Sequence, residues 1–264
     1  MRILVTGDWH LDARTAGYDR FDDLRSAVDW TVELASREHV DLYVMLGDLC
    51  DPDTTRSHRA VGIACATAAK LADLGIAQVW IAGNHDVIED GTGSTTMAAL
   101  VGWSRSRRFQ PGKIRTPIAL GIPEMGPHEG RMCHVAEEPI HIPRYFGTTN
   151  DLIFLPFTAR AKAYDPRAFV EKTRLSPNCR KVLVFGHLNV IGADDGSEVE
   201  DFPRGREVVF PVDELLAKWG DKCLLFNGHY HRRQTVRGVR MPGALGRLGF
   251  GEVGNPAGVL LVVV

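Results

Sequence analysis

The chain has 264 residues, of which 44% are hydrophobic and 24% are charged, and its formal net charge is −2. This length provides a sizeable core, and the composition is ordinary for a globular protein, which argues against a disordered or fibrous chain. The near-neutral charge excludes a global basic field of the kind that attracts nucleic acid, but not a local basic patch.

Targeting signals and cysteine spacing bear on the compartment. The sequence contains no apolar run near the roughly 18 residues of a membrane-spanning helix. The first residues lead directly into an expected strand, without the layout of a signal peptide. The five cysteines are scattered, with no closely spaced pair, which favours buried thiols over disulfides or a zinc site. We therefore expect a cytoplasmic protein with no membrane segment.

Strands and helices are expected to alternate in the first third of the chain. Apolar runs predict buried strands, and apolar residues at helical spacing predict amphipathic helices. This alternation is typical of βαβ units in a sheet that is covered by helices, and thus of an α/β fold. In order, we expect a strand from Arg2 to Thr6, a helix from Phe21 to Glu38, a strand from Leu42 to Leu46, a helix from His58 to Leu74, capped near Ser57, and a strand from Ala77 to Ala82.

The pattern weakens between residues 89 and 150, where glycines and prolines are frequent. Here Met97 to Trp103 suggests one or two helical turns, and Val135, Ile140 and Ile142 suggest short strands of a second sheet. Residues 192–206 are polar and are expected to form an exposed loop. The later expected elements are a strand at 151–156, a helix that starts at Asp165-Pro166 and runs to Arg174, a strand at 181–185, a helix at 213–219, a strand at 223–226 and β-structure from Gln234 to the end.

A chemically suggestive tetrapeptide, Gly83 to Asp86, follows the strand at 77–82. Gly83 allows the backbone to approach closely, and Asn84 offers a neutral oxygen to a metal. His85 can give or take a proton near neutral pH, and Asp86 can orient that imidazole. The same residue types are common in turns, so the interpretation depends on ligands at other strand ends.

Matching residues follow four further strands, each after a glycine. Asp8 and His10 lie two positions apart, so both side chains point to one side of extended backbone. Five such loops are stronger evidence than one, because unrelated surface histidines would not all follow buried strands. The candidate residues are Asp8, His10, Asp48, Asn84, His85, His187, His229 and His231. We interpret the remaining histidines as structural or surface residues, in helices or loops without partners; they are His39, His58, His128, His134 and His141.

This ordered set resembles the calcineurin-like metallophosphoesterase superfamily, whose motifs D-x-H, G-D, G-N-H-D, G-H and G-H-x-H are matched in order. The resemblance implies a two-sheet α/β sandwich flanked by helices, as a single domain over residues 1–264, with two divalent metal ions where the loops converge. Mixed nitrogen and oxygen ligands suit Mn, Fe or Zn better than Ca, and we expect Mn first.

The resemblance also implies a role for each residue. One ion would be held by Asp8, His10 and His231, the other by Asn84, His187 and His229, and Asp48 would bridge them. The metals would activate a water for in-line attack. His85 would donate a proton to the leaving oxygen or stabilise the transition state, and Asp86 would set its charge and orientation.

Two further stretches are similar to DNA double-strand-break nucleases of the SbcD type. They are Gly7 to Leu11, and the segment from Arg240 through Phe250-Gly251-Glu252. The similarity implies a DNA exonuclease or endonuclease of repair and recombination that acts as a homodimer or with an SbcC-type ABC ATPase. It covers the nuclease core, so we expect that core without the capping domain of such nucleases.

Two alternatives remain open at this point. A small-molecule or cyclic-nucleotide phosphodiesterase or phosphatase could use the same metals, with a closed pocket in place of an open groove. A binding module with a silent metal site is the other, although the intact ligand set argues against it. Arg105, Arg107 and Arg108 are candidates for contacting substrate phosphates, with a solvated loop as the alternative.

Overall fold

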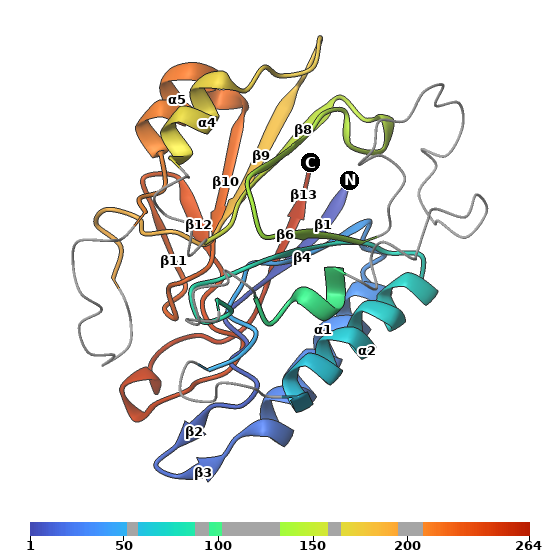
Figure 1. Cartoon of the computed structure of the whole chain (residues 1–264), viewed down its shortest axis with the longest axis vertical. Helices are drawn as coiled ribbons and strands as arrows, with labels where there is room; N and C mark the ends of the chain where they lie inside the picture. The colour runs from blue at the N-terminus through green and yellow to red at the C-terminus, as the bar shows by residue number, and fades with distance from the viewer. Residues whose placement is uncertain (52–57, 88–94, 102–132, 158–164, 195–207) are drawn as a thin grey trace.

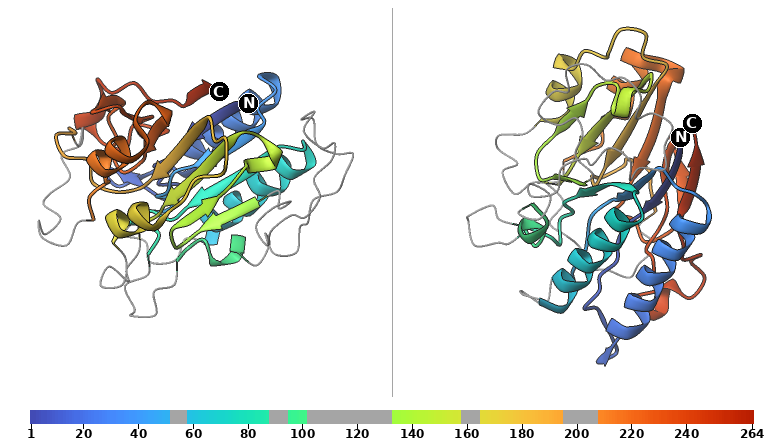
Figure 2. Two further views of the ribbon diagram at one scale, coloured as in Figure 1. Left: turned by 90° about the horizontal axis from the view of Figure 1, so that it is seen from above. Right: turned by 90° about the vertical axis from the view of Figure 1, so that its right-hand side faces the viewer.

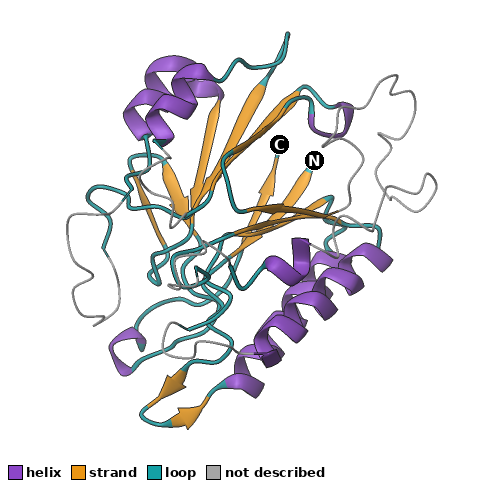
Figure 3. Cartoon of the chain, in the orientation of Figure 1, coloured by secondary structure: helices purple, strands orange, loops and turns teal. Residues whose placement is uncertain are grey.

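Two β-sheets lie face to face in the computed structural model, and helices cover their outer faces (Figure 1). The structure describes residues 1–51, 58–87, 95–101, 133–157, 165–194 and 208–264. Figure 2 shows the same layers from two further sides, and Figure 3 shows that loops gather at one end of both sheets. The expected α/β sandwich is therefore confirmed.

The first sheet has five strands, four of them parallel. Only the strand at the carboxyl end of the chain runs antiparallel to its neighbour, and it brings the two termini together, with the Met1 nitrogen 2.7 Å from the Val264 carbonyl oxygen. Across the sheet, the strands are β13 (Leu260–Val263), β1 (Arg2–Thr6), β4 (Leu42–Met45), β5 (Ala77–Ile81) and β6 (Cys133–Ala136).

Helices α1 (Phe21–Arg37) and α2 (His58–Asp73) cover the outer face of this sheet (Figure 1). Their apolar stripes pack on alternate residues of the strands, such as Leu4 and Trp80, as the two-residue period of a strand requires. Both helices match the expected ranges to within one residue at the carboxyl end. The expected cap at Ser57 lies outside the described residues.

The second sheet has six strands, with a parallel centre and an antiparallel strand at each edge. Helices α4 (Pro166–Lys172) and α5 (Val212–Trp219) cover its outer face. The Asp165 side chain caps α4 by accepting from the Arg167 backbone N–H. The strands in spatial order are β11 (Gln234–Val236), β12 (Val239–Met241), β10 (Cys223–Asn227), β9 (Lys181–Gly186), β8 (Asn150–Leu155) and β7 (Ile140–Ile142).

An apolar core fills the space between the sheets. Ile3 and Val5 of the first sheet meet Phe154, Phe185 and Phe226 of the second. Aromatic stacking links the three phenylalanines, whose ring centroids are 5.6 and 5.1 Å apart in succession. This core fixes one sheet relative to the other, so loops from both sheets hold defined relative positions.

Two smaller expectations were wrong. Val135 lies in β6, which extends the first sheet; only Ile140 and Ile142 belong to the second. The end of the chain is not continuous β-structure, because residues 242–259 separate β12 from β13 and contain the 3₁₀ turn η4 (Phe250–Glu252). Glycines and two prolines occur in that stretch, which favours turns over strands. Of the one or two helical turns expected from Met97 to Trp103, residues 98–101 are helical, Met97 lies in the turn before them, and residues 102–103 lie outside the described range.

The remaining short elements are a hairpin of β2 (Arg14–Thr15) and β3 (Tyr18–Asp19) and the 3₁₀ turns η2 (Tyr145–Gly147) and η3 (Gly220–Lys222). None of the described helices combines the length and apolarity that a membrane crossing needs. All five cysteines are free thiols.

Candidate metal centre

Loops at the carboxyl ends of β1, β4, β5, β9 and β10 meet at one end of the sandwich. Backbone hydrogen bonds join them in pairs: the Asp8 N–H donates to the Gly47 carbonyl at 2.9 Å, and the Gly228 N–H donates to the Gly186 carbonyl at 3.0 Å. The His229 N–H crosses between the sheets to donate to Asp8 Oδ1 at 2.8 Å. Residues from distant parts of the sequence are thereby placed side by side, as expected for strand ends in α/β sheets.

Four of the candidate ligands have left-handed backbone conformations. The φ angles are +51° for Asp8, +42° for His10, +56° for Asp48 and +76° for His229. Each such non-glycine residue costs on the order of 1–3 kcal/mol and persists only where its surroundings impose it. Such positions are frequent at functional sites, and here they turn the side chains of tightly bent loops inward.

Glycine is required at two of these strand ends because the loops approach so closely. A Cβ atom on Gly83 would lie 2.5 Å from the Asp48 nitrogen and 2.8 Å from His187 Cε1. One on Gly47, whose φ is +102°, would lie 2.5 Å from His187 Nδ1. Contacts this short do not occur in real structures, so these glycines let the ligand loops pack together.

The first group of candidate ligands contains Asp8, His10 and His231, whose ligand atoms all lie within 4.8 Å of one another. The Nε2 atoms of the two histidines are 3.1 Å apart, and the rings meet edge to face. Asp8 Oδ2 is buried and has no hydrogen-bond partner among the residues that the structure describes. Asp8 and His10 are expected ligands of one ion together with His231, and the structure brings the three together.

The second group contains Asp48, His187 and His229, with Asn84 at its centre. Asn84 Oδ1 lies 2.9 Å from His187 Nε2 and 2.9 Å from His229 Nδ1. These three are the expected ligands of the other ion. Asp48 Oδ2 is 3.1 Å from His187 Nε2 and 3.8 Å from His10 Nε2 of the first group, which is the position that a bridging carboxylate requires.

The hydrogen-bond chemistry of these groups fits cations. His231 donates Nδ1–H to Glu252, so its Nε2 presents a lone pair towards His10. In the second group His187 donates Nδ1–H to the Leu46 carbonyl at 2.6 Å, so its Nε2 lone pair faces the Asn84 oxygen, which is itself an acceptor. Acceptor atoms facing one another at about 3 Å repel unless a cation or a proton lies between them.

The pKa values of the candidate ligands are also shifted by burial and by their close neighbours. Burial is the largest influence on Asp8 and raises its pKa to about 7. Burial opposes protonation of His187, but the Asp48 carboxylate outweighs it and raises the pKa of His187 to about 9. Burial and the neighbouring His187 lower the pKa of His229 to about 3. His187 therefore takes up a positive charge beside Asp48, a role that a metal cation would fill.

His85 lies at the edge of the two groups and belongs to neither. Its backbone N–H donates to Asp48 Oδ1 at 3.0 Å, its Nε2 is 4.0 Å from Asp48 Oδ2, and its partly exposed ring packs edge to face on His10. The imidazole is thus beside the bridging carboxylate and still reachable by a substrate.

The hydrogen bonds of Asp86 differ from those expected. Asp86 is fully buried, and each of its carboxylate oxygens accepts two hydrogen bonds. The donors are the N–H groups of Asp48, Leu49 and Gly83 and the Thr96 hydroxyl, at 2.8–2.9 Å. The sequence predicts that Asp86 orients the His85 imidazole; these contacts indicate instead that it holds the Gly83 loop to the Gly47 loop.

The other expectations have mixed outcomes. Arg105, Arg107 and Arg108 lie outside the described residues, as does His128. The description of the non-motif histidines was wrong in part, since His134 and His141 lie in strands and His141 Nε2 is 2.9 Å from Asp151 Oδ2.

Sequence reasoning missed the partners of the ligands. Glu252 accepts from His231 at 2.6 Å, and Asn189 Oδ1 lies 3.1 Å from His229 Nε2. The Asn227 side-chain amide links the two loops of the second sheet. Its oxygen accepts from the Leu188 N–H, and its NH₂ group donates to the Gly228 carbonyl. Glu252 could have been noticed as the last residue of the segment that resembles the SbcD type. Asn189 and Asn227 carry no comparable signal.

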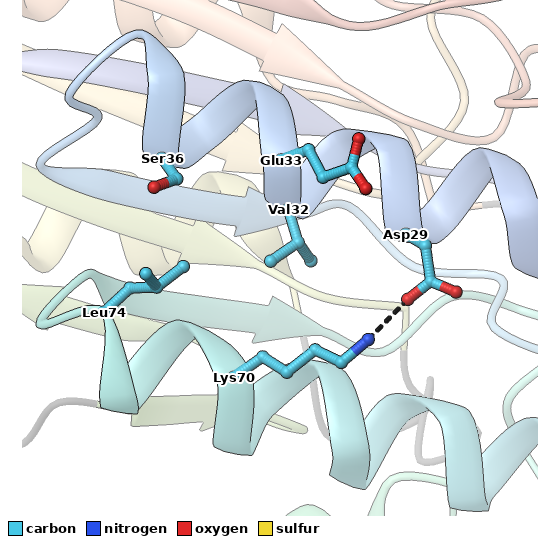
Figure 4. Close-up of a pocket in the computed structure, with 6 residues that line it drawn as sticks. All are labelled: Asp29, Val32, Glu33, Ser36, Lys70 and Leu74. Carbon is cyan, nitrogen blue, oxygen red and sulfur yellow. Dashed lines mark hydrogen bonds and ion pairs between the residues drawn. The ribbon is translucent and has the colours of Figure 1, made fainter.

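A surface groove of about 490 Å³ lies elsewhere, between α1 and α2 (Figure 4). Val32 and Leu74 line it together with polar residues, and an ion pair joins Lys70 Nζ to Asp29 Oδ1 across it at 2.6 Å. None of the candidate ligands lines this groove.

Comparisons with known proteins agree with this site. Residues 1–233 match the family model described as calcineurin-like phosphoesterase. The chain is 26% identical to the SbcD component of the SbcCD nuclease of Escherichia coli K12 across 99% of this chain, and 24% identical to the protein of the same name in Bacillus subtilis across 91%. It spans 64% and 59% of the lengths of these two relatives.

A solved structure, a dimetal phosphatase from Danio rerio, is 12% identical to the chain, with a TM-score of 0.46 over 91% of this chain and 86% of that one. With an identity and a TM-score this low, the likeness says nothing about substrate or mechanism. The match to the family model spans most of the chain and includes every candidate ligand. The chain therefore belongs to the calcineurin-like phosphoesterase family of metal-dependent hydrolases, which bind two divalent metal ions.

Proposed function

We propose that this chain hydrolyses phosphodiester bonds in DNA as a dinuclear metal nuclease of the SbcD type. The observation that carries the proposal is the pair of ligand groups that share Asp48, since two neighbouring cation sites suit phosphoester hydrolysis. The choice of DNA rests on the relatives named as components of a nuclease, which match 91–99% of this chain.

Asp8, His10 and His231 are proposed to hold one ion, and Asn84, His187 and His229 the other, with Asp48 between them. Two bound dications would supply charge for the phosphoryl oxygens and a nucleophile at neutral pH. The chain itself contributes preorganisation: buried loops hold these seven side chains in place before substrate arrives, so little reorganisation accompanies the reaction.

His85 is proposed to act on the leaving group. Its imidazole is partly exposed beside the bridging carboxylate and is not needed as a ligand, so it is available to donate a proton or to hydrogen-bond the substrate. Asp86 contributes indirectly, by fixing the backbone N–H groups of Asp48 and Gly83.

Manganese is the proposed metal, with iron and zinc as the competitors, because the ligands are imidazoles and oxygens without a thiolate. An SbcC-type ATPase is the proposed partner, because the relatives are named as one component of the SbcCD nuclease. A homodimer is also proposed, on the family resemblance alone.

The test is cleavage of end-labelled oligonucleotides, single-stranded and duplex, by the purified chain with manganese. The Asp48→Asn variant serves as the inactive control. A generic phosphodiester ester and cyclic nucleotides are assayed in parallel. Manganese-dependent cleavage of either oligonucleotide supports the nuclease. Turnover of small phosphodiesters alone would instead assign the chain to the small-molecule class.

A further inference from the structure

His231 and His229, two residues apart, face the metal groups through different nitrogen atoms. The first nitrogen directed into the centre is Nε2 of His231, which lies 3.1 Å from His10 Nε2. The second is Nδ1 of His229, which lies 2.9 Å from Asn84 Oδ1. A neutral imidazole carries its single proton on one nitrogen, so the two rings need opposite tautomers.

Each ring has an acceptor on its outer nitrogen. Glu252 Oε1 lies 2.6 Å from His231 Nδ1, and the Glu252 side chain is almost completely buried. Asn189 Oδ1 lies 3.1 Å from His229 Nε2 and also accepts from the Tyr230 hydroxyl at 3.3 Å. A carboxylate oxygen and an amide oxygen can only accept here, so each requires the proton on the outer nitrogen.

We propose that Glu252 and Asn189 are positioning residues that fix the opposite tautomers of His231 and His229, and that each governs cation affinity at one of the two sites. This inference rests on the two-metal centre proposed above. Glu252 serves the site of Asp8, His10 and His231. Asn189 serves the site of Asn84, His187 and His229. Neither residue belongs to either group of candidate ligands.

Glu252 also connects its site to an exposed turn that precedes β13. Its second oxygen, Oε2, accepts from the Leu248 N–H at 2.6 Å. The surrounding segment is largely exposed, and Phe250 has 76% of its surface accessible. One buried carboxylate thus accepts hydrogen bonds both from the exposed turn at residues 247–254 and from a candidate metal ligand.

The test separates the two sites by zinc titration followed through the side-chain ¹⁵N signals of the histidines. The signals of His10 and His231 report one site, and those of His187 and His229 report the other. In Glu252→Leu, which removes the acceptor, we expect the dissociation constant of the first site to rise by about 10–100-fold, the usual effect of losing a ligand's outer partner, with the second site unchanged. In Asn189→Leu we expect the dissociation constant of the second site to rise by a similar factor, with the first site unchanged.

Two variants control for structure. Asn189→Asp keeps an acceptor oxygen and should restore the affinity of the second site and the Nε2–H signal of His229. Glu33→Gln, an exposed position on α1, should change neither site. Equal weakening of both sites by either variant, or unchanged affinity in both, would overturn the inference. A wild-type chain that binds no zinc would instead reject the metal centre itself.

Discussion

The Oδ2 atom of Asp48 lies 3.1 Å from Nε2 of His187, so a carboxylate of the first sheet meets an imidazole of the second in the centre of the site. The contact depends on the fold at several levels. Gly47 and Gly83 leave room for it, the stacked phenylalanines between the sheets hold the strands in position, and Asp86 fixes the Asp48 backbone. Changes at any of these levels should therefore alter the centre in distinguishable ways.

Replacing His85 with alanine should separate chemistry from metal binding. The ring is not a member of either ligand group, so metal content should stay at the wild-type level. Loss of a positioned proton donor costs about 10²–10⁴-fold in rate, and we expect kcat to fall within that range. The measurement is phosphodiester turnover beside metal analysis of the same sample. Full activity in this variant would refute the proposed role of His85.

Gly83→Ala should disrupt the centre by steric overlap. The added methyl group would meet the Asp48 carboxylate and backbone and His187 Cε1, all within 2.8 Å, and these atoms are themselves buried. We expect a loss of at least about 2 kcal/mol in the free energy of unfolding, as for overpacked cores, together with weaker metal binding.

The matched control is Gly62→Ala, in the exposed face of α2, where a Cβ atom would meet nothing within 4 Å. Alanine is preferred over glycine in a helix by about 1 kcal/mol, so this variant should be slightly more stable than the wild type. Urea denaturation of both variants measures the contrast, and equal stabilities would show that the Gly83 loop adjusts without strain.

Metal binding should stabilise the fold and should depend on pH. A cation at 100 times its dissociation constant adds about 2.7 kcal/mol to the free energy of unfolding, so the melting temperature should rise with manganese and fall with chelator. Burial raises the pKa of Asp8 to about 7, and a proton on Asp8 competes with the cation. The manganese-dependent shift should therefore be largest above pH 7 and shrink as the pH falls below it.

Differential scanning calorimetry from pH 5.5 to 8.5, with manganese or with chelator, measures this shift. The Asp48→Asn variant is expected to lose most of it at every pH. A manganese effect that is equal in wild type and variant, or that grows in acid, would contradict the assignment of these carboxylates as ligands.

The candidate ligands could be selected from the sequence because each follows a buried apolar strand, a signal that depends only on local order, and the structure brings them together. The wrong predictions involve non-local pairing. Val135 is apolar in either sheet, and only its register opposite Trp80 decides which sheet it joins. Likewise, the position of Asp86 next to His85 suggested a local hydrogen bond between them. The Asp86 carboxylate instead accepts hydrogen bonds from a loop that only the folded chain brings close.

The ligand partners were missed for the same reason. Glu252 reaches His231 across 21 residues, and no spacing rule connects a carboxylate in a 3₁₀ turn with an imidazole after a strand. Asn189 is an ordinary polar residue in a loop until the strand order places β9 beside β10. Strand ends can be inferred from sequence, but the contacts between loops require the topology.

Asp151, at the opposite end of β8 from the metal centre, should control stability in acid without affecting metal binding. It is fully buried and accepts from His141 Nε2 at 2.9 Å and from the N–H groups of Arg144 and Ser176 at 3.0 and 2.7 Å. Burial opposes ionisation of this carboxyl, but the hydrogen bonds from His141 and the backbone outweigh it and lower its pKa well below the usual value.

A carboxyl with a lowered pKa in the folded state adds stability above its unfolded pKa of about 3.9, and that contribution disappears as the pH falls through the folded value. Asp151→Asn should lose about 1–3 kcal/mol at pH 7, because an amide NH₂ group would face a buried donor. Its stability should also decline less steeply than that of the wild type below pH 4. Asp221→Asn, on an exposed 3₁₀ turn, removes the same charge and should leave both unchanged. Urea denaturation between pH 2.5 and 7 measures the free energy of unfolding of each variant. If this free energy falls equally steeply with decreasing pH in Asp151→Asn and in the wild type, the buried carboxylate does not control stability in acid.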